Sequence, residues 1–342
     1  MMLRNIRQIG MLSLPILLAG AMTSLTAQAE KTLVVTSTNA AANQLLVYSS
    51  EGSLLQTLAT NGTGGASGNA GGIAASHDLV AVVNTGSQTV AIFEREDRGL
   101  RLVDTVGAAS NPLSVAFGHG HLYILGTTTI ESHPISNKVV SQSADGTATL
   151  LHADGSAAQV GVLPNELIIS EKSNAIETIG LSGGEVVGAP ALVANIPANV
   201  NAPFGLVTRG ADAYVTIAHA NEISLVRHDT VLTVTGSGTQ SAPCWVALEG
   251  SYLFSANSPS HSVSRYVVYG EKIVQDAAVI ASFTGSPTDI AATGTLAAVV
   301  DGSAGVSRLS IFGVDGNGNF TLIKANTIPS AANGVVILQD GE

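Results

Sequence analysis

The sequence predicts an all-β fold, a ring of seven four-stranded blades known as a seven-bladed β-propeller, and three observations support this prediction. A unit of short apolar strands and polar turns recurs about every 45 residues, the length of one blade. No stretch beyond the N-terminal segment shows the 3.6-residue apolar period of a helix. The two ends of the chain carry complementary parts of one unit. Together these features favour a closed ring of blades.

The first strand of the unit follows a small or polar residue, often with a proline between them. The prolines Pro112, Pro203, Pro243 and Pro287 are 91, 40 and 44 residues apart, and the first interval spans two periods. Weaker copies complete the set, which comprises residues 71–75, 111–116, 159–163, 202–207, 242–247, 286–291 and 333–338. The sequence therefore predicts seven innermost strands.

The second part of the unit is an apolar run, a polar turn and another apolar run. Residues 79–83, 84–88 and 89–93 give the clearest copy. The remaining turns are centred on Asn39, Thr128, Lys172, His219, Ser258 and Gly302. A fourth strand follows a third turn, as in the Asp-Gly-Asn-Gly-Asn turn at 315–319, where Gly and Asn accept the positive φ angles of tight hairpins. Each blade is therefore expected to hold four strands.

The chain ends indicate how the ring closes. The N-terminal part begins with the second and third strands of a unit, at 32–36 and 45–48, whereas the C-terminal part ends with a first strand at 334–338. Pairing these parts in one sheet removes an exposed edge. We therefore expect the C-terminal inner strand to pair with the N-terminal strands.

The first 29 residues have the composition of an export signal. Arg4 and Arg7 precede an apolar stretch at about 9–25, and small residues at 27 and 29 flank one position before Glu30. The stretch is short for a membrane span. The sequence predicts a signal peptide over 1–29, cleaved after Ala29, and a propeller domain over 30–342 in a secreted or periplasmic protein. A buried N-terminal helix is the alternative.

Composition narrows the range of partners. The formal net charge is −11 with scattered Lys and Arg, which disfavours nucleic acid and anionic membranes, because both attract basic surfaces. The single cysteine, Cys244, permits no intramolecular disulfide, and we expect it to pack as a small apolar residue. We expect a monomer without a cofactor.

Several segments resemble the bacterial YVTN-repeat and lactonase-like propellers, a group that includes 6-phosphogluconolactonase and carboxymuconate cyclase-like proteins. The sequence Tyr-Val-Thr-Ile at 214–217, followed by Asn-Glu-Ile-Ser at 221–224, is similar to the repeat signature. Residues 252–257 with 263–264, and 82–84 with 88–90, are further versions. The resemblance covers the chain from residue 30 and implies a seven-bladed ring, with activity left open because these motifs encode packing.

Candidate site residues come from the loops that enter the first strands and from the second-to-third turns, because strand alternation places both at one end of the blades. The entry loops offer Asn111 and Asn201 as binding residues, with Ser241, Ser286 and Asn333 at the same place in other units. Asp289 lies just inside one inner strand. It is a candidate for binding and for catalysis, although a capping or turn role beside Pro287 is the favoured interpretation.

The second-to-third turns supply further titratable candidates, namely Glu131, His133, Lys172, His219, His261 and Asp301. His219 and His261 join Asp289 as catalytic candidates because a general base must titrate near the working pH. The spacing of these residues fits no metal site, and solvated turn residues are the alternative. No residue matches a catalytic position of the lactonases.

Three other features have structural interpretations. Arg265 and Arg308 occupy the same place in adjacent units, and we expect them to form packing contacts or salt bridges between blades in preference to an anion site. The calcium-loop-like pattern at 315–319 lacks the later ligands and indicates a hairpin turn. The glycine-rich run at 62–72 predicts a flexible link between the first two blades.

The sequence supports a binding function more directly than a catalytic one. Our first hypothesis is a propeller that binds a small molecule, peptide or protein on one face. Few charged residues are expected around the central channel that the seven inner strands would enclose, which disfavours catalysis there. The alternative is a divergent lactonase that opens a sugar lactone or interconverts a muconate and its lactone. A structural surface protein without a small ligand is a third possibility.

Overall fold

The computed structural model describes residues 32–76, 78–96, 99–194, 201–303 and 305–339. Residues from Lys31 to Glu342 form one compact unit. The predicted signal segment at 1–29 and its cleavage site lie outside the described residues.

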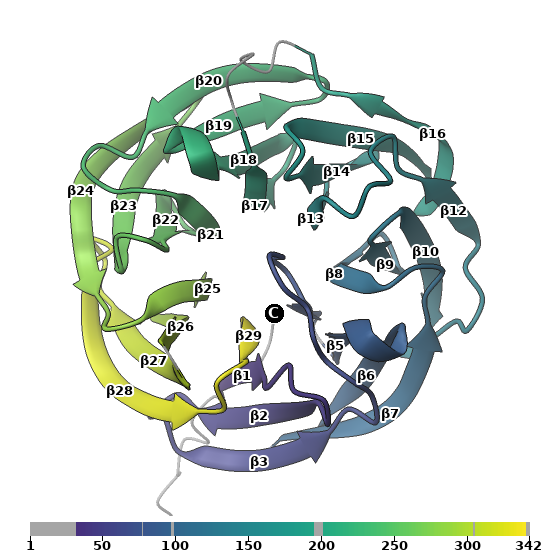
Figure 1. Cartoon of the computed structure of the whole chain (residues 1–342), viewed down its shortest axis with the longest axis horizontal. Helices are drawn as coiled ribbons and strands as arrows, with labels where there is room; N and C mark the ends of the chain where they lie inside the picture. Colours follow the sequence, from purple (N-terminus) through teal and green to yellow (C-terminus); the bar gives the residue numbers. More distant parts are fainter. Residues whose placement is uncertain (1–31, 77, 97–98, 195–200, 304, 340–342) are drawn as a thin grey trace, which may run out of the picture. The chain divides into compact units, whose positions relative to one another are not determined.

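The prediction of a seven-bladed propeller is confirmed: seven antiparallel sheets are arranged in a ring (Figure 1). Blade 1 consists of β29 (Asn333–Leu338), β1 (Leu33–Ser37), β2 (Gln44–Ser49) and β3 (Leu54–Ala59), named from the centre outward. Blade 2 consists of β4 (Ile73–Ala75), β5 (Leu79–Asn84), β6 (Thr89–Glu96) and β7 (Gly99–Gly107). Blade 3 consists of β8 (Pro112–Gly118), β9 (His121–Gly126), β10 (Thr129–Ser136) and an outer strand in two pieces, β11 (Val139–Val140) and β12 (Gly146–Thr149).

The other four blades follow the same order. Blade 4 consists of β13 (Ala157–Val162), β14 (Glu166–Glu171), β15 (Ala175–Ser182) and β16 (Glu185–Leu192), and blade 5 of β17 (Pro203–Arg209), β18 (Asp212–Ile217), β19 (Glu222–Arg227) and β20 (Thr230–Gly236). Blade 6 consists of β21 (Pro243–Glu249), β22 (Tyr252–Asn257), β23 (Ser262–Tyr269) and β24 (Lys272–Ser282), and blade 7 of β25 (Ser286–Thr293), β26 (Leu296–Ser303), β27 (Val306–Val314) and β28 (Phe320–Ile328). Within the described ranges the helical elements are two short 3₁₀ turns, η1 (Thr85–Ser87) and η2 (Ala218–Ala220).

Residue type follows position in the blade. The second strands are covered on both sides by neighbouring blades, so β1 and β5 are mostly apolar and are buried along their whole length. The outermost strands face solvent on one side, and β3 accordingly alternates between exposed and half-buried residues. Strands that are covered on both sides are thus mostly apolar, whereas a strand that is covered on one side, such as β3, alternates in exposure along its length.

The ring closes as the sequence predicts. β29 pairs antiparallel with β1, placing Leu338 opposite Leu33 and Val335 opposite Thr36. The Thr36 hydroxyl donates a 2.7 Å hydrogen bond to the Gly334 carbonyl across this junction. Blade 1 is therefore built from the two ends of the chain.

Polar side chains also tie neighbouring inner strands together. Ser114 Oγ, Gln159 Oε1 and Asp289 Oδ2 accept hydrogen bonds of 3.2, 2.7 and 2.9 Å from backbone N–H groups of the following blade. For Asp289 the donor is Val335, on the strand that closes the ring. A hydroxyl, an amide and a carboxylate thus perform the same structural task at corresponding places.

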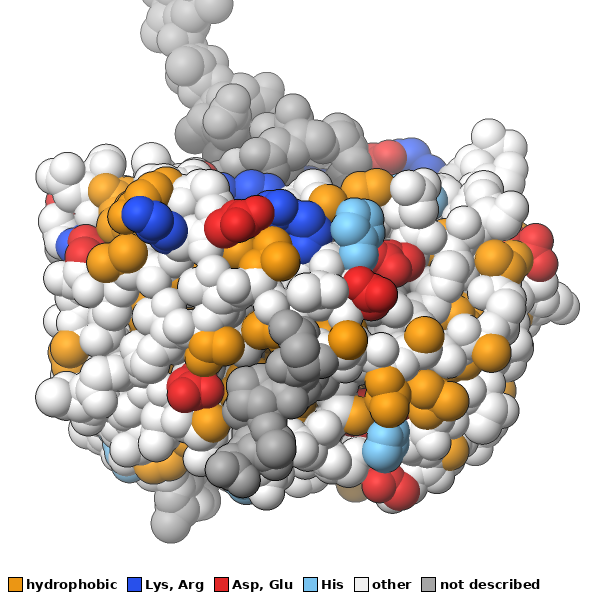
Figure 2. All heavy atoms as spheres, turned by 90° about the horizontal axis from the view of Figure 1, so that it is seen from above, with side chains coloured by type: hydrophobic (Ala, Val, Ile, Leu, Met, Phe, Trp, Pro, Cys, Tyr) orange, Lys and Arg blue, Asp and Glu red, His pale blue; other side chains and the backbone are white. Residues whose placement is uncertain are grey.

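The surface carries few charges, in keeping with the composition. On the side shown in Figure 2, Lys and Arg side chains are interspersed with Asp and Glu and form no continuous basic area. In the part of the chain that the structure describes, no helix is both long and apolar enough to span a bilayer.

Candidate functional site

The loops that enter the first strands and the second-to-third turns lie at the same end of the blades, as predicted. The N–H of His219 in one such turn donates to the carbonyl of Asn201 in the entry loop of the same blade, and Thr127 donates to Asn111 in the same way. We call this end the upper face and the end formed by the first-to-second turns the lower face. The upper face carries the sequence-predicted candidates.

The glycine-rich run at 62–72 closes the centre of the upper face, which corrects the prediction of a flexible link. It does connect blades 1 and 2, but it extends to the middle of the ring (Figure 1). Asn69 and Ala70 are only 1% and 2% exposed. The Asn69 amide donates to the Leu113 carbonyl at 2.6 Å, and its side-chain oxygen accepts from Asn333 at 2.7 Å. We call residues 62–72 the plug.

The composition of the plug follows from the narrow space that it occupies. The Asn69 carbonyl accepts the indole N–H of Trp245 at 3.2 Å, so one residue contacts blades 3, 6 and 1. At Gly64 a Cβ atom would lie 2.4 Å from the carbonyl carbon of Asn39, and Gly71 has a φ of +64°. Side chains at these two positions would clash or strain the backbone. The glycines therefore fit a packed segment, although the same composition is typical of a linker.

Replacing Asn69 with alanine should loosen the plug and destabilise the ring. The change removes two buried hydrogen bonds and leaves the Leu113 carbonyl and the Asn333 amide unpaired, a loss of about 2–4 kcal/mol. Trp245 is the single tryptophan, so its emission should become more accessible to acrylamide. Thermal unfolding and fluorescence quenching measure both effects. Asn111→Ala, which removes one exposed hydrogen bond, is the control, and equal behaviour of the two variants would contradict the plug.

Asp289 is a structural tie in this structure. Its side chain is 7% exposed, and its carboxylate oxygens accept from the N–H groups of Ile290 and Val335, both at 2.9 Å. Burial raises the pKa of this carboxyl to about 7, although both amides favour the charged form. The sequence favoured a capping or turn role beside Pro287, whereas in the structure the carboxylate contacts both its own neighbour, Ile290, and Val335 of the next blade.

The other candidates on the upper face are dispersed. Asn111 and Asn201 are exposed, and the Asn111 amide donates to the Thr85 carbonyl of blade 2. His219 is exposed in η2. Lys172 donates from Nζ to Gly68 of the plug at 2.6 Å, so it holds the plug in place.

Three predicted turn residues instead belong to strands: Glu131 and His133 to β10, and Asp301 to β26. Glu131 and His133 are buried. Glu131 accepts a 2.7 Å hydrogen bond from the N–H of Ala109, which fixes the entry loop of blade 3. The apolar run after Thr128 begins earlier than the pattern suggests, so the polar side chains fall inside it. Among the described residues no three His, Cys, Asp or Glu side chains cluster as metal ligands.

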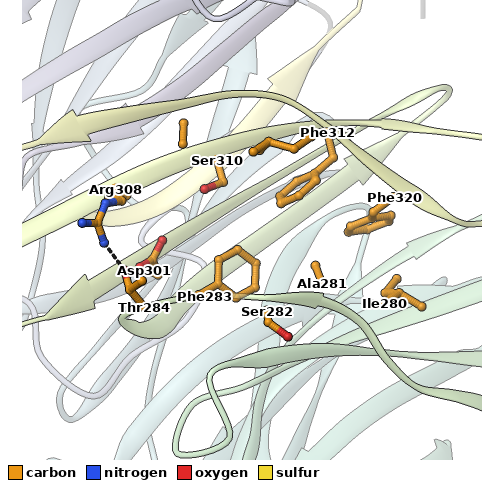
Figure 3. A pocket seen from close by; sticks show the side chains of 12 residues that line it. Ile280, Ala281, Ser282, Phe283, Thr284, Asp301, Arg308, Ser310, Phe312 and Phe320 are labelled. Atoms are coloured by element: carbon orange, nitrogen blue, oxygen red, sulfur yellow. Dashed lines mark hydrogen bonds between the residues drawn. The ribbon is translucent and has the colours of Figure 1, made fainter.

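A cavity of about 490 Å³ lies between blades 6 and 7, and two further candidates from the sequence, Asp301 and Arg308, line it. Three phenylalanines line its apolar part: Phe283 after β24, Phe312 on β27 and Phe320 on β28 (Figure 3). The ring centroids of Phe312 and Phe320 are 5.3 Å apart, and those of Phe283 and Phe312 are 6.1 Å apart with perpendicular planes. We call this cavity the aromatic pocket.

The opposite end of the aromatic pocket is polar. Asp301 and Arg308 are cross-strand partners on β26 and β27, and Arg308 donates a hydrogen bond to the Thr284 hydroxyl (Figure 3). Burial raises the pKa of Asp301, while the Gly285 N–H and the charges of Arg308 and His261 act in the opposite direction. The pocket therefore joins an aromatic wall to a cation and a carboxyl group.

Arg265 and Arg308, which the sequence presents as equivalent, have different roles. Arg265 binds Asp276 of its own blade and donates to the Asn317 carbonyl of blade 7, so the predicted contact between blades is confirmed. Arg308 has no carboxylate oxygen within 4.0 Å among the described residues. Its guanidinium lines the pocket. Only Arg308 is thus available to a ligand.

The aromatic pocket could not be predicted from the sequence because its residues are far apart in the chain. Aromatic residues make up only 4% of the sequence, so no local cluster of them marks a site. Four of the seven phenylalanines nevertheless meet here, since Phe254 packs at 4.8 Å behind Phe320. The sequence does contain one indication: four of the seven phenylalanines lie between residues 254 and 320, within the last two units.

No family model and no curated protein matches the sequence. Solved structures match over most of the chain. A candidate 6-phosphogluconolactonase from Bacteroides fragilis is 15% identical with a TM-score of 0.65, covering 92% of this chain and 99% of its own. The periplasmic gluconolactonase of Pseudomonas aeruginosa is 14% identical with a TM-score of 0.66, covering 90% and 99%. An inactive variant of virginiamycin B lyase from Staphylococcus aureus is 14% identical with a TM-score of 0.56, covering 80% and 93%.

At these identities the likeness shows the fold alone. The chain is similar along nearly its whole length to 6-phosphogluconolactonase-like propellers, and over a smaller part to the lyase. It therefore shares the seven-bladed propeller fold of lactonase-like proteins.

Proposed function

We propose that this protein is a secreted or periplasmic binding propeller that holds a small carboxylic acid with an apolar body in the aromatic pocket. The observation that carries the proposal is the position of Arg308 at the polar end of a cavity walled by three phenylalanines. The proposed export rests on the signal-like segment at 1–29, and a monomer suffices because one chain supplies every lining residue.

Size and lining support a small ligand. A volume of about 490 Å³ lies within the range of small-molecule sites, which combine mostly apolar walls with a few polar groups. An aromatic or aliphatic body would contact Phe283, Phe312 and Phe320 and leave water. The walls come from two blades, so blade packing holds them in place.

Charge sets the orientation of the ligand. A guanidinium pairs with a carboxylate through two parallel hydrogen bonds, and the Arg308 side chain has a hydroxyl partner, Thr284, but no carboxylate within 4.0 Å among the described residues. The carboxylate of the ligand would therefore lie at the polar end with its body toward Phe320. Asp301 beside Arg308 favours a ligand that also offers a hydrogen-bond donor, such as a hydroxyl group.

Calorimetric titration of the mature chain, beginning at Glu30, with 4-phenylbutyrate tests the proposal. We expect saturable binding that weakens at high salt, because the contact with Arg308 is ionic. Arg308→Gln should weaken binding at least tenfold, since a charge-assisted pair contributes about 1.5–3 kcal/mol. Arg101→Gln removes an exposed arginine of blade 2 and should leave the affinity unchanged. Equal affinities of the two variants would refute the proposed site.

The alternative function is a divergent lactonase. It is favoured by the fold shared with gluconolactonase structures and by the closeness of His261 to Asp301, which affects the pKa of that carboxyl. Incubation with gluconolactone and with muconate substrates separates the two functions. Turnover that disappears in His261→Ala would make the protein an enzyme, whereas the binding proposal expects no turnover above the spontaneous rate.

A further inference from the structure

A second space, independent of the aromatic pocket, lies along the axis of the ring. It consists of two cavities of about 250 and 430 Å³ that share Gln159, Leu206 and Val207 in their linings. The smaller cavity is lined from β4, β8, β13 and β17, and the larger from β4, β13, β17, β21, β25 and β29. All seven inner strands thus enclose one lumen.

The lumen is closed at the upper face. Most of its lining residues belong to the middle or the second halves of the inner strands, such as Val246 on β21 and Ile290 on β25. Above them, Ala70 of the plug packs with Phe204 and Trp245, whose rings meet edge to face at 5.2 Å. The plug therefore forms the blind end of the lumen.

The lumen opens toward the lower face. Lining residues near the first-to-second turns, including Phe117, Thr208 and Thr293, are half-buried, whereas the apolar lining residues nearer the plug, such as Leu206 and Ile290, are buried. Exposure therefore increases from the plug toward the lower face. A ligand would enter from the end opposite to the predicted candidates.

The lining is almost entirely aliphatic. Its polar side chains are Gln159, Thr208 and Thr293, and it holds no charged side chain among the described residues. Gln159 lies at the blind end, since a Cβ atom on Gly71 of the plug would be 3.1 Å from its Nε2. The oxygen of Gln159 accepts from the Leu206 N–H, while its amide nitrogen donates no hydrogen bond within the described residues. The blind end thus offers one free donor in apolar surroundings.

The geometry points to a binding site for a neutral aliphatic molecule that ends in a carbonyl oxygen, such as a ketone, ester or amide. The oxygen accepts a hydrogen bond from Gln159 Nε2, and the aliphatic chain extends along the inner strands toward the lower face. An ion is disfavoured because no opposite charge lines the lumen to offset its desolvation. This site differs from the aromatic pocket in face, lining and ligand charge.

The test uses 2-heptanone as the probe and the mature chain beginning at Glu30. We expect saturable binding, seen by saturation-transfer NMR and by a change in the emission of Trp245, the single tryptophan beside the plug. Gln159→Glu keeps an acceptor for the Leu206 N–H but replaces the free donor with an oxygen. It should weaken binding about tenfold.

Filling the lumen provides a second and independent variant. Ala292→Phe places a ring in the larger cavity and Thr208→Phe places one in the smaller, and both positions are half-buried and hence tolerant. Each folded variant should lose binding at least tenfold, while Arg308→Gln should bind 2-heptanone as the unaltered protein does. Absence of saturable binding, or full binding in both filled variants, would overturn the proposal. Neither result bears on 4-phenylbutyrate.

Discussion

Removing residues 333–342 should leave the chain unable to form a stable propeller. The deletion takes away β29, whose Val335 and Leu338 are each 3% exposed. Val335 packs with residues of blade 7, and Leu338 packs with residues of blade 2. Losing one large buried apolar side chain typically costs about 2–5 kcal/mol, and here the backbone pairing with β1 disappears as well. The total approaches the net stability of a typical domain, about 5–15 kcal/mol.

Circular dichroism during heating measures this effect. The truncated chain should melt without a cooperative transition, while a control chain that ends at Gln339 retains β29 and should melt as the full chain does. A circular permutant supplies an independent check. A short loop joining the end of β29 to the start of β1 should be tolerated, because Leu338 and Leu33 are paired. A truncated chain with unchanged melting would contradict the closure.

Replacing Asp289 with asparagine should change how stability depends on pH. The pKa of this carboxyl rises from 3.8 to about 7 on folding because it is buried. Between these values the folded protein binds a proton that the unfolded chain has lost, so its contribution to stability falls as pH rises from about 4 to 7. A shift of this size corresponds to a free energy on the order of 4 kcal/mol.

The variant lacks this titration. Asparagine keeps one oxygen for the Val335 N–H but no longer accepts from both amides, so its absolute stability is not the relevant quantity. The difference in unfolding free energy between the two proteins should shift in favour of the variant as pH rises from 4 to 8. Other buried carboxyls, such as Glu171 with a pKa raised to about 7 by burial, titrate in both proteins and cancel. Parallel pH profiles from urea unfolding would contradict this assignment.

The fold could be predicted because each blade repeats the same constraints. The motif that resembles the YVTN repeat records strand packing: Asn257 at the end of β22 is buried and donates to the hydroxyls of Ser262 and Ser264 on β23. Such contacts join residues that are close in the sequence, so they recur as a short motif that can be recognised in several units. The closure was predictable for the same reason, since β29 completes the unit that β1 and β2 begin.

The sites could not be predicted because they depend on contacts between distant segments. The plug has the composition of a linker, and only its burial against β8, β21 and β29 distinguishes the two. Arg265 and Arg308 have the same local sequence, yet Asp276 pairs with one and nothing comparable pairs with the other among the described residues. Asp289 was a catalytic candidate because its contact with Val335 crosses a blade boundary and leaves no local pattern in the sequence.

The proposed function unites the aromatic pocket with its single available cation. A crystal structure of the mature protein with 4-phenylbutyrate is the most direct measurement. We expect the phenyl ring to lie against Phe312 and Phe320 and the carboxylate to pair with Arg308. A ligand bound elsewhere, or a carboxylate directed away from Arg308, would contradict the proposal.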